Sequence, residues 1–275
     1  MDQHRDRARA TVGEFETVTR TTLVLLPGLD GTEIFLGPLL SRLPSWITPV
    51  VVTYPPSGPN TYEDLVPVAE RAVESLEEFV ILGWSFGGPL ALMVASRRPS
   101  QVTGIILCAS FVTPPRPGMV RYRQALGTPL VATIRALRRL RFLIPGYGTA
   151  ELRKAKGRTW RRVKARVLAT RARAALGVDV RALLGECRAR LLYLASSHDE
   201  TIPRTCIEEV LAIAPQTQVA EIDGPHMALF TNPGQAAACI AEFLRAEYSP
   251  CHSGLTSRRY NGVFGLTRNP AVEKT

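Results

Sequence analysis

The stretch that decides the fold is Phe79-Val80-Ile81-Leu82-Gly83-Trp84-Ser85-Phe86-Gly87-Gly88-Pro89-Leu90-Ala91-Leu92, in which Gly-x-Ser-x-Gly joins two apolar runs. The first run is typical of a buried strand and the second of a helix, which places Ser85 on the tight turn between them. Such a turn exposes the serine hydroxyl at a sheet edge, and it needs small neighbours because the backbones come close together. A glycine-rich turn that binds nothing is one alternative; a phosphate loop is another, but no Gly-Lys-Ser/Thr follows. The pattern favours Ser85 as a nucleophile.

Further apolar runs alternate with helical patterns on both sides of this turn. Buried strands are predicted at 21–26, 49–53, 102–111, 189–197 and 219–222, in addition to the strand before Ser85. Apolar residues at helical spacing predict helices at 62–78, 204–214 and 233–248, besides the one after Ser85. This alternation predicts an α/β fold with a mostly parallel, doubly wound sheet. We expect a core of residues 21–115 and 186–248, a flexible N-terminal segment at 1–20 and a disordered tail at 249–275.

The predicted core is interrupted by residues 116–185, a segment too long for an ordinary crossover. Apolar residues at helical spacing predict an inserted helical cap here; they are Leu130, Val131, Ile134, Leu137, Leu140, Trp160, Val163, Val167 and Leu168. The segment is also strongly basic: from Arg116 to Arg173 there are 17 Lys and Arg against one acidic residue, in a chain whose net charge is +10. We expect the cap to cover Ser85 and to form the roof and walls of a substrate pocket.

The composition argues against several other classes of protein. No run approaches the roughly 20 apolar residues that span a bilayer, and the charged N-terminus lacks the apolar run of a secretory signal, so a cytoplasmic location is expected. The five cysteines form no Cys-x-x-Cys pair and no His-spaced cluster, which predicts reduced thiols and no structural metal site. Cys108 lies in an apolar run and is expected to be buried and inert.

A serine nucleophile needs a base that takes its proton and an acid that orients the base. Of the four histidines, His226 lies in the turn after the last predicted strand and is the candidate base. The other three lie in the predicted tails or directly before the favoured carboxylate. That carboxylate is Asp199, which follows a predicted strand and precedes a helix, so it should project over the sheet edge where catalytic groups collect. The alternatives to it are Glu200, Asp179 and Asp223.

Four segments together resemble the α/β-hydrolase superfamily, over roughly Thr21–Tyr248. They are Leu26-Pro27-Gly28-Leu29-Asp30-Gly31-Thr32, Gly83-Trp84-Ser85-Phe86-Gly87-Gly88, His198-Asp199-Glu200-Thr201-Ile202-Pro203 and Gly224-Pro225-His226. The resemblance implies that the backbone amides of Leu29 and Phe86 form an oxyanion hole and that Trp84 contacts the substrate. One departure is that many relatives carry His-Gly in the first segment, where this chain has Pro27-Gly28.

The same resemblance implies a serine carboxylesterase that works through an acyl-enzyme intermediate, with no metal or cofactor. Gly-Trp-Ser-x-Gly-Gly and the length of the insertion resemble the pimeloyl-[acyl-carrier protein] methyl ester carboxylesterases of bacterial biotin synthesis. A small or medium acyl ester, or a methyl ester linked to an acyl-carrier protein, is then the expected substrate. Thioesterase, lipase or cofactor-free perhydrolase activity on the same triad is an alternative, as is a non-catalytic binding protein.

The basic cap has two interpretations. Charged runs most often form a solvated helix face, but a strongly basic surface can also attract an acidic acyl-carrier protein to the mouth of the pocket. The candidate contacts are Arg135, Arg138, Arg139, Arg158 and Arg162. No nucleic-acid partner is expected, because no aromatic residues interleave with the arginines.

Overall fold

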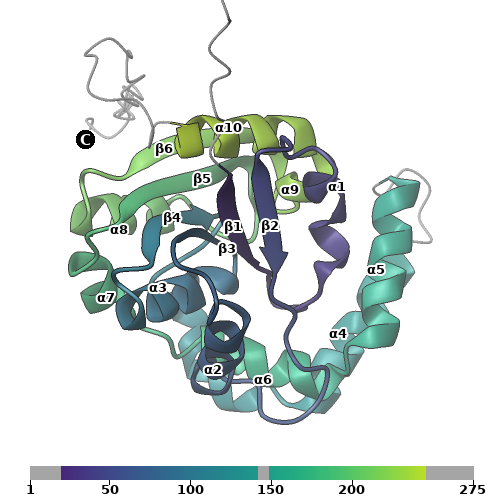
Figure 1. Ribbon diagram of the computed structural model, residues 1–275. Helices are drawn as coiled ribbons and strands as arrows, with labels where there is room; N and C mark the ends of the chain where they lie inside the picture. The colour runs from purple at the N-terminus through teal and green to yellow at the C-terminus, as the bar shows by residue number, and fades with distance from the viewer. Residues whose placement is uncertain (1–19, 142–148, 246–275) are drawn as a thin grey trace, which may run out of the picture.

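The computed structural model describes residues 20–141 and 149–245, without the side chains of 138–141. In this range a six-stranded sheet has the order β2-β1-β3-β4-β5-β6, and each neighbouring pair is parallel (Figure 1). The strands are β1 (Thr21–Leu26), β2 (Ile47–Val51), β3 (Phe79–Trp84), β4 (Val102–Cys108), β5 (Arg190–His198) and β6 (Gln218–Pro225). The predicted α/β class and parallel sheet are confirmed. All carboxyl ends of the strands therefore lie at one edge of the sheet.

Two boundaries differ from the predictions for local reasons. β4 ends at Cys108 rather than at 111, because Ala109 has a φ of 43°, in the left-handed region that a strand cannot contain. The helix predicted at 62–78 is α2 (Tyr62–Ala72), and the chain then turns back with the Leu76 N–H donating to the Val73 carbonyl at 3.0 Å.

The apolar side chains of the strands alternate between two cores, one on each face of the sheet. In β1, Val24 and Leu26 belong to the first core, while Leu23 and Leu25 belong to the second. The first core is covered by α2, α3 (Gly87–Arg97) and α8 (Thr205–Ile213), and the second by α1 (Gly37–Leu40) and α10 (Pro233–Arg245). Because both faces are buried, the strands appear in the sequence as continuous apolar runs.

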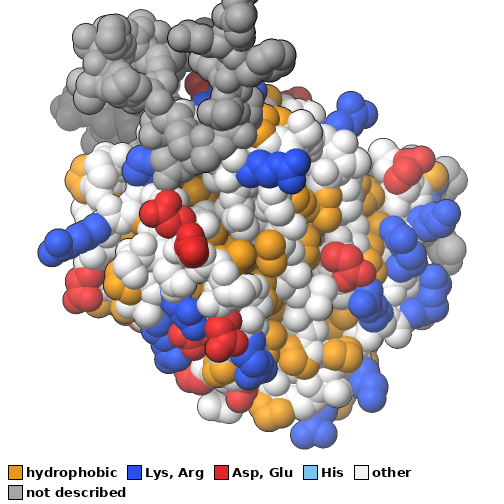
Figure 2. Space-filling view, in the orientation of Figure 1, with side chains coloured by type: hydrophobic (Ala, Val, Ile, Leu, Met, Phe, Trp, Pro, Cys, Tyr) orange, Lys and Arg blue, Asp and Glu red, His pale blue; other side chains and the backbone are white. Residues whose placement is uncertain are grey.

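The segment from 116 to 185, here called the basic insertion, joins β4 to β5. It contains η2 (Pro117–Ala125), α4 (Thr128–Arg141), α5 (Ala150–Arg162), α6 (Ala165–Ala175) and α7 (Arg181–Gly185). In Figure 1, α6 lies below the arrowheads of β1 and β2, and α5 stands at the right; Figure 2 shows Lys and Arg side chains gathered over α5. Some of the apolar side chains that predicted the cap are not buried: on α4, Leu130, Ile134 and Leu137 are 43%, 38% and 58% exposed.

The remaining expectations concern thiols, metals, membranes and the chain ends. Cys108 is a buried free cysteine, as predicted, and burial raises the pKa of its thiol. Among residues 20–141 and 149–245, no helix is long and apolar enough to cross a bilayer, and no three His, Cys, Asp or Glu side chains gather as metal ligands would. The predicted flexible segment, apart from Arg20, and the predicted tail at 249–275 lie outside the described residues.

Candidate active site

Ser85 lies on the turn between β3 and α3, with a φ of 52° that is rare for a residue other than glycine. The neighbouring glycines make this turn sterically feasible. A Cβ atom at Gly87 would lie 2.5 Å from the Leu26 carbonyl oxygen, and one at Gly88 would overlap Ser110 Oγ. The small residues that the sequence analysis required are therefore needed for contact between backbones and for packing against β4.

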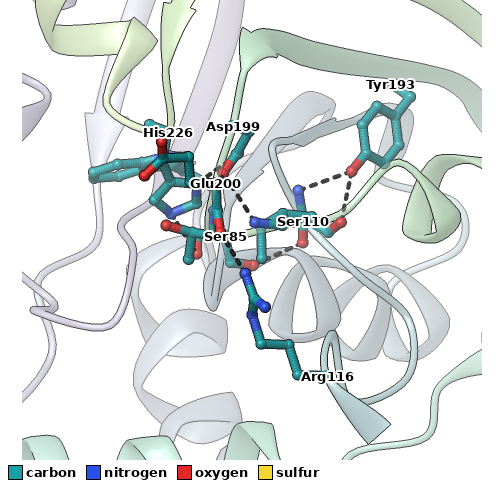
Figure 3. A network of polar contacts seen from close by, with 10 residues as sticks. Ser85, Ser110, Arg116, Tyr193, Asp199, Glu200 and His226 are labelled. Atoms are coloured by element: carbon teal, nitrogen blue, oxygen red, sulfur yellow. Dashed lines mark hydrogen bonds and ion pairs between the residues drawn. The ribbon is translucent and has the colours of Figure 1, made fainter.

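The structure brings Ser85, His226 and Asp199 into one hydrogen-bonded row (Figure 3). His226 Nε2 lies 3.0 Å from Ser85 Oγ, and His226 Nδ1 lies 2.7 Å from Asp199 Oδ2. The other carboxylate oxygen, Oδ1, accepts the backbone N–H groups of Thr201 at 2.7 Å and Ile202 at 2.9 Å. The histidine and aspartate side chains are 18% and 7% exposed. Three residues that follow three different strands thus meet at the carboxyl edge of the sheet.

None of the alternative acids reaches His226. Asp223 is 79% exposed and lies 3.6 Å from His198 Nδ1. Asp179 is exposed and forms an ion pair with an arginine of α7. Glu200 is exposed as well.

The backbone amides of Leu29 and Phe86 have no partner among the turn and loop hydrogen bonds of the described residues. The Phe86 amide belongs to the peptide group whose carbonyl is that of Ser85, and this carbonyl accepts Ser110 Oγ at 2.7 Å. In a trans peptide the N–H points away from such a bonded carbonyl. The Leu29 amide belongs to a peptide whose carbonyl, that of Gly28, accepts the Gly31 N–H at 3.0 Å. The oxyanion role of these two amides stays a prediction.

The sequence matches the Alpha/beta hydrolase family over residues 23–238, which is most of the chain. The chain belongs to the α/β-hydrolase family. Among curated proteins it is 25% identical to the biotin biosynthesis bifunctional protein BioHC of Cellvibrio japonicus over 288 residues, which cover 91% of this chain and 54% of that protein. The chain thus spans about half the length of this relative.

Solved structures of other α/β-hydrolases share the fold. A structure from a study of carboxylesterases of Nitrososphaera gargenis is 17% identical with a TM-score of 0.68, and covers 83% of this chain and 91% of its own. An enol-lactonase from Burkholderia xenovorans LB400 is 16% identical with a TM-score of 0.63, and the match covers 82% of this chain and 92% of the lactonase chain. At these identities the likeness concerns the fold alone.

Trp84 is buried beside His226 in this α/β-hydrolase. Its indole is 3% exposed, and the ring N–H donates to the carbonyl of His226 at 3.3 Å. The indole and imidazole centroids are 5.8 Å apart. The side chain expected to contact substrate therefore packs against the histidine backbone and ring, and a substrate contact stays a prediction.

The arginines expected to contact a carrier protein have different environments. Arg135 donates to the Val163 carbonyl at 2.8 Å and to the Trp160 carbonyl at 2.5 Å, and Arg162 forms an ion pair with Glu33 at 2.5 Å. These two therefore have partners within the chain. The side chain of Arg158 is exposed, while those of Arg138 and Arg139 lie outside the described part.

The basic insertion contacts two loops of the site. Arg116, just before η2, donates to the carbonyl of Glu200 in the loop that carries Asp199 (Figure 3). Arg171, on α6, donates to the carbonyls of Leu29 and Asp30 in the other loop. Both loops that flank Ser85 are therefore connected to the insertion.

Two functional candidates, Ser110 and Arg171, were missed by the sequence analysis. Ser110 is fully buried, and its hydroxyl donates to the Ser85 carbonyl. Tyr193 supports it by donating its own hydroxyl to the Ser110 carbonyl at 2.6 Å (Figure 3). A serine within an otherwise apolar run is a usable signal, because buried hydroxyls need partners. Arg171 gave a weaker signal: it lies four residues after Val167, on the same buried face of α6.

Proposed function

We propose that this α/β-hydrolase is a serine carboxylesterase. The observation that carries the proposal is the row of side chains from Asp199 through His226 to Ser85, with heavy-atom distances of 2.7 and 3.0 Å. The 3.0 Å distance from His226 Nε2 to Ser85 Oγ is in the range that proton transfer to and from a nucleophile requires, and the 2.7 Å distance lets Asp199 orient the imidazole. The histidine is also flanked by a mostly buried carboxylate, which suits an imidazolium that forms during reaction.

The proposed reaction has two halves. His226 Nε2 takes the proton of Ser85 while Oγ forms a bond to the ester carbonyl carbon, and the carbonyl oxygen becomes an oxyanion. The amides of Leu29 and Phe86 would donate to that oxyanion, each contributing about 3 to 4 kcal/mol to the transition state. The C–O bond to the alcohol then breaks as His226 returns the proton. Water attacks the acyl-enzyme by the same route and releases the acid.

Ser85→Ala tests the proposal with p-nitrophenyl acetate and butyrate as substrates. The matched control is Ser197→Ala, because the Ser197 hydroxyl also lies near a histidine and an aspartate, His198 Nδ1 at 2.6 Å and Asp223 Oδ1 at 2.9 Å, but on an exposed site. We expect the first variant to hydrolyse at the rate of buffer and the control to keep its activity within about twofold. Equal activity in wild type and Ser85→Ala would favour a binding protein, and chain-length profiles with oxygen esters and thioesters separate esterase from thioesterase.

A methyl ester carried by an acyl-carrier protein is the second candidate substrate. It is supported by the 25% identity to BioHC and by the basic character of the segment from Arg116 to Arg173, which has 17 Lys and Arg and one acidic residue. Electrostatic attraction of an acidic carrier would raise the rate of encounter and weaken with salt.

The test is turnover of such an ester by Arg158→Glu, with Arg42→Glu, an exposed arginine outside the insertion, as control. We expect kcat/KM to fall severalfold only for the first variant, and the loss to shrink as salt rises. A kcat/KM that changes neither with salt nor with the Arg158→Glu substitution would contradict this candidate substrate.

A further inference from the structure

Arg171 is a fully buried arginine with no exposed surface, and it comes from α6 of the basic insertion. Its guanidinium donates only to neutral oxygens: Nη1 to the carbonyls of Leu29 at 3.0 Å and Asp30 at 2.7 Å, and Nη2 to the Pro55 carbonyl at 2.9 Å. Nε and Nη2 also donate to Asn60 Oδ1 at 3.0 and 2.6 Å. A buried cation is costly unless its donors are satisfied, and here every nitrogen is used.

Two of the five hydrogen bonds of Arg171, those to the Leu29 and Asp30 carbonyls, hold the loop of residues 27–31 that follows β1. The other three go to Pro55 and Asn60. Tyr54 holds the same loop: its hydroxyl donates to the Pro27 carbonyl at 2.9 Å, and its N–H donates to the Gly31 carbonyl at 2.9 Å. The Arg171 Cζ lies 5.2 Å from the Tyr54 ring centroid. With the bond from Gly31 to the Gly28 carbonyl, each carbonyl of the loop has a donor, so the loop is held through its carbonyl groups. The Leu29 amide has no partner among the turn and loop hydrogen bonds of the described residues.

The loop and its surroundings also fit closely in shape. Gly31 has a φ of 69°, and a Cβ atom there would lie 2.5 Å from Arg171 Nη1 and 2.6 Å from Tyr54 Cδ2. Only glycine can therefore occupy this position while Arg171 stays in place. Arg171 and the loop are therefore in close steric contact at Gly31, in addition to their hydrogen bonds.

We propose that Arg171 is a positioning residue that fixes the 27–31 loop so that the Leu29 amide serves the oxyanion formed at Ser85. Its hydrogen bonds go to Leu29, Asp30, Pro55 and Asn60 and not to Ser85. The inference rests on the proposed esterase function. Arg171 thus braces the Pro27-Gly28 loop from the insertion. The insertion and the oxyanion hole are coupled as a result, since α6 cannot move without releasing the Leu29 and Asp30 carbonyls.

The charge of Arg171 suits this role at neutral pH. Burial lowers the pKa of the guanidinium to about 10, which still leaves it protonated near pH 7. Protonated, it has the five donors that its five hydrogen bonds use. Methionine, which is of similar length, has no donor for either carbonyl.

Arg171→Met is the test, with Arg166→Met, an exposed arginine of the same helix, as control. The readouts are kcat and KM for p-nitrophenyl butyrate and Ki for a trifluoromethyl ketone, whose carbonyl adds to Ser85 Oγ and becomes an oxyanion. We expect kcat to fall about 10- to 100-fold, KM to change less than about threefold, and Ki to rise by the factor lost from kcat. A purely structural arginine would lower the melting temperature without this parallel change, and wild-type kcat and Ki in folded Arg171→Met would overturn the proposal.

Asn60→Ala keeps the test decisive if Arg171→Met does not fold, because it removes the acceptor of two guanidinium bonds and retains the arginine. We expect a severalfold fall in kcat with a matching rise in Ki; wild-type values for both would overturn the proposal. Failure of the esterase function itself has a different signature. In that case Ser85→Ala keeps wild-type activity, whereas failure of this inference alone leaves Ser85→Ala inactive and Arg171→Met unimpaired.

Discussion

Replacing Asp199 by asparagine is the sharpest test of the proposed triad, because the structure dictates how the new amide must lie. Oδ1 of Asp199 accepts two backbone N–H groups, and Oδ2 faces His226 Nδ1. The asparagine oxygen will stay with the two N–H donors, so its NH2 group will face the imidazole. Nδ1 must then accept a hydrogen bond, which places the ring proton on Nε2 and leaves no lone pair for the Ser85 proton.

The expected loss of kcat in Asp199→Asn follows from the free energy needed to turn the asparagine amide into the opposite orientation. Turning the amide to restore the productive tautomer would leave two backbone donors facing NH2, at about 1 to 3 kcal/mol each. A total of about 2 to 6 kcal/mol corresponds to roughly 30- to 10⁴-fold in the population able to react. The variant also lacks the negative charge that stabilises the imidazolium. We therefore expect kcat to fall by about 10³ to 10⁴.

The assay is steady-state hydrolysis of p-nitrophenyl butyrate, with circular dichroism and melting temperature to show that Asp199→Asn is folded. Asp223→Asn serves as the control, because this exposed carboxylate was an alternative acid and lies beside His198. The control should keep its activity within about twofold. A loss below tenfold in Asp199→Asn, or a large loss in the control, would refute the assignment of Asp199 as the acid.

Three further predictions concern stability and reactivity. Gly88→Ala should destabilise the protein by about 1 to 3 kcal/mol in urea unfolding, because its Cβ would overlap Ser110 Oγ. The control Gly37→Ala, with open space around its Cβ, should not, and equal stabilities of the two variants would contradict the packing argument. Native Cys108 should resist a thiol reagent at pH 8 and react after denaturation, as mass spectrometry would show, because burial raises its pKa; fast native labelling would be inconsistent with this. Burial also raises the pKa of Asp30, so the folded state binds more protons than the unfolded state above pH 3.8. The free energy of unfolding of the wild type should therefore fall relative to that of Asp30→Asn as pH rises from about 4 to 7. A rise in this difference would contradict the raised pKa.

Local sequence patterns determined the strands, the sheet type and the position of the serine turn. Continuous apolar runs predict buried parallel strands, and a tight turn between β3 and α3 admits only small neighbours, so the residues around Ser85 carry their own signal. His226 and Asp199 could be predicted because chain order places residues that follow parallel strands at one edge of the sheet. These inferences need only nearest-neighbour geometry and topology.

The tertiary structure alone decided which of several similar residues lie beside the loops that flank Ser85. Asp199 and Asp223 both follow strands predicted from the sequence, yet of these two only Asp199 is hydrogen-bonded to His226, and Asp223 lies within β6. Among the 17 basic residues from Arg116 to Arg173, only the spacing from Val167 separates Arg171 from its exposed neighbours, and this spacing does not reveal its partners, because they include carbonyls about 140 residues away. Hydrogen bonds between distant segments depend on where a side chain points after the helices have packed, and a linear pattern of residue types does not encode that direction.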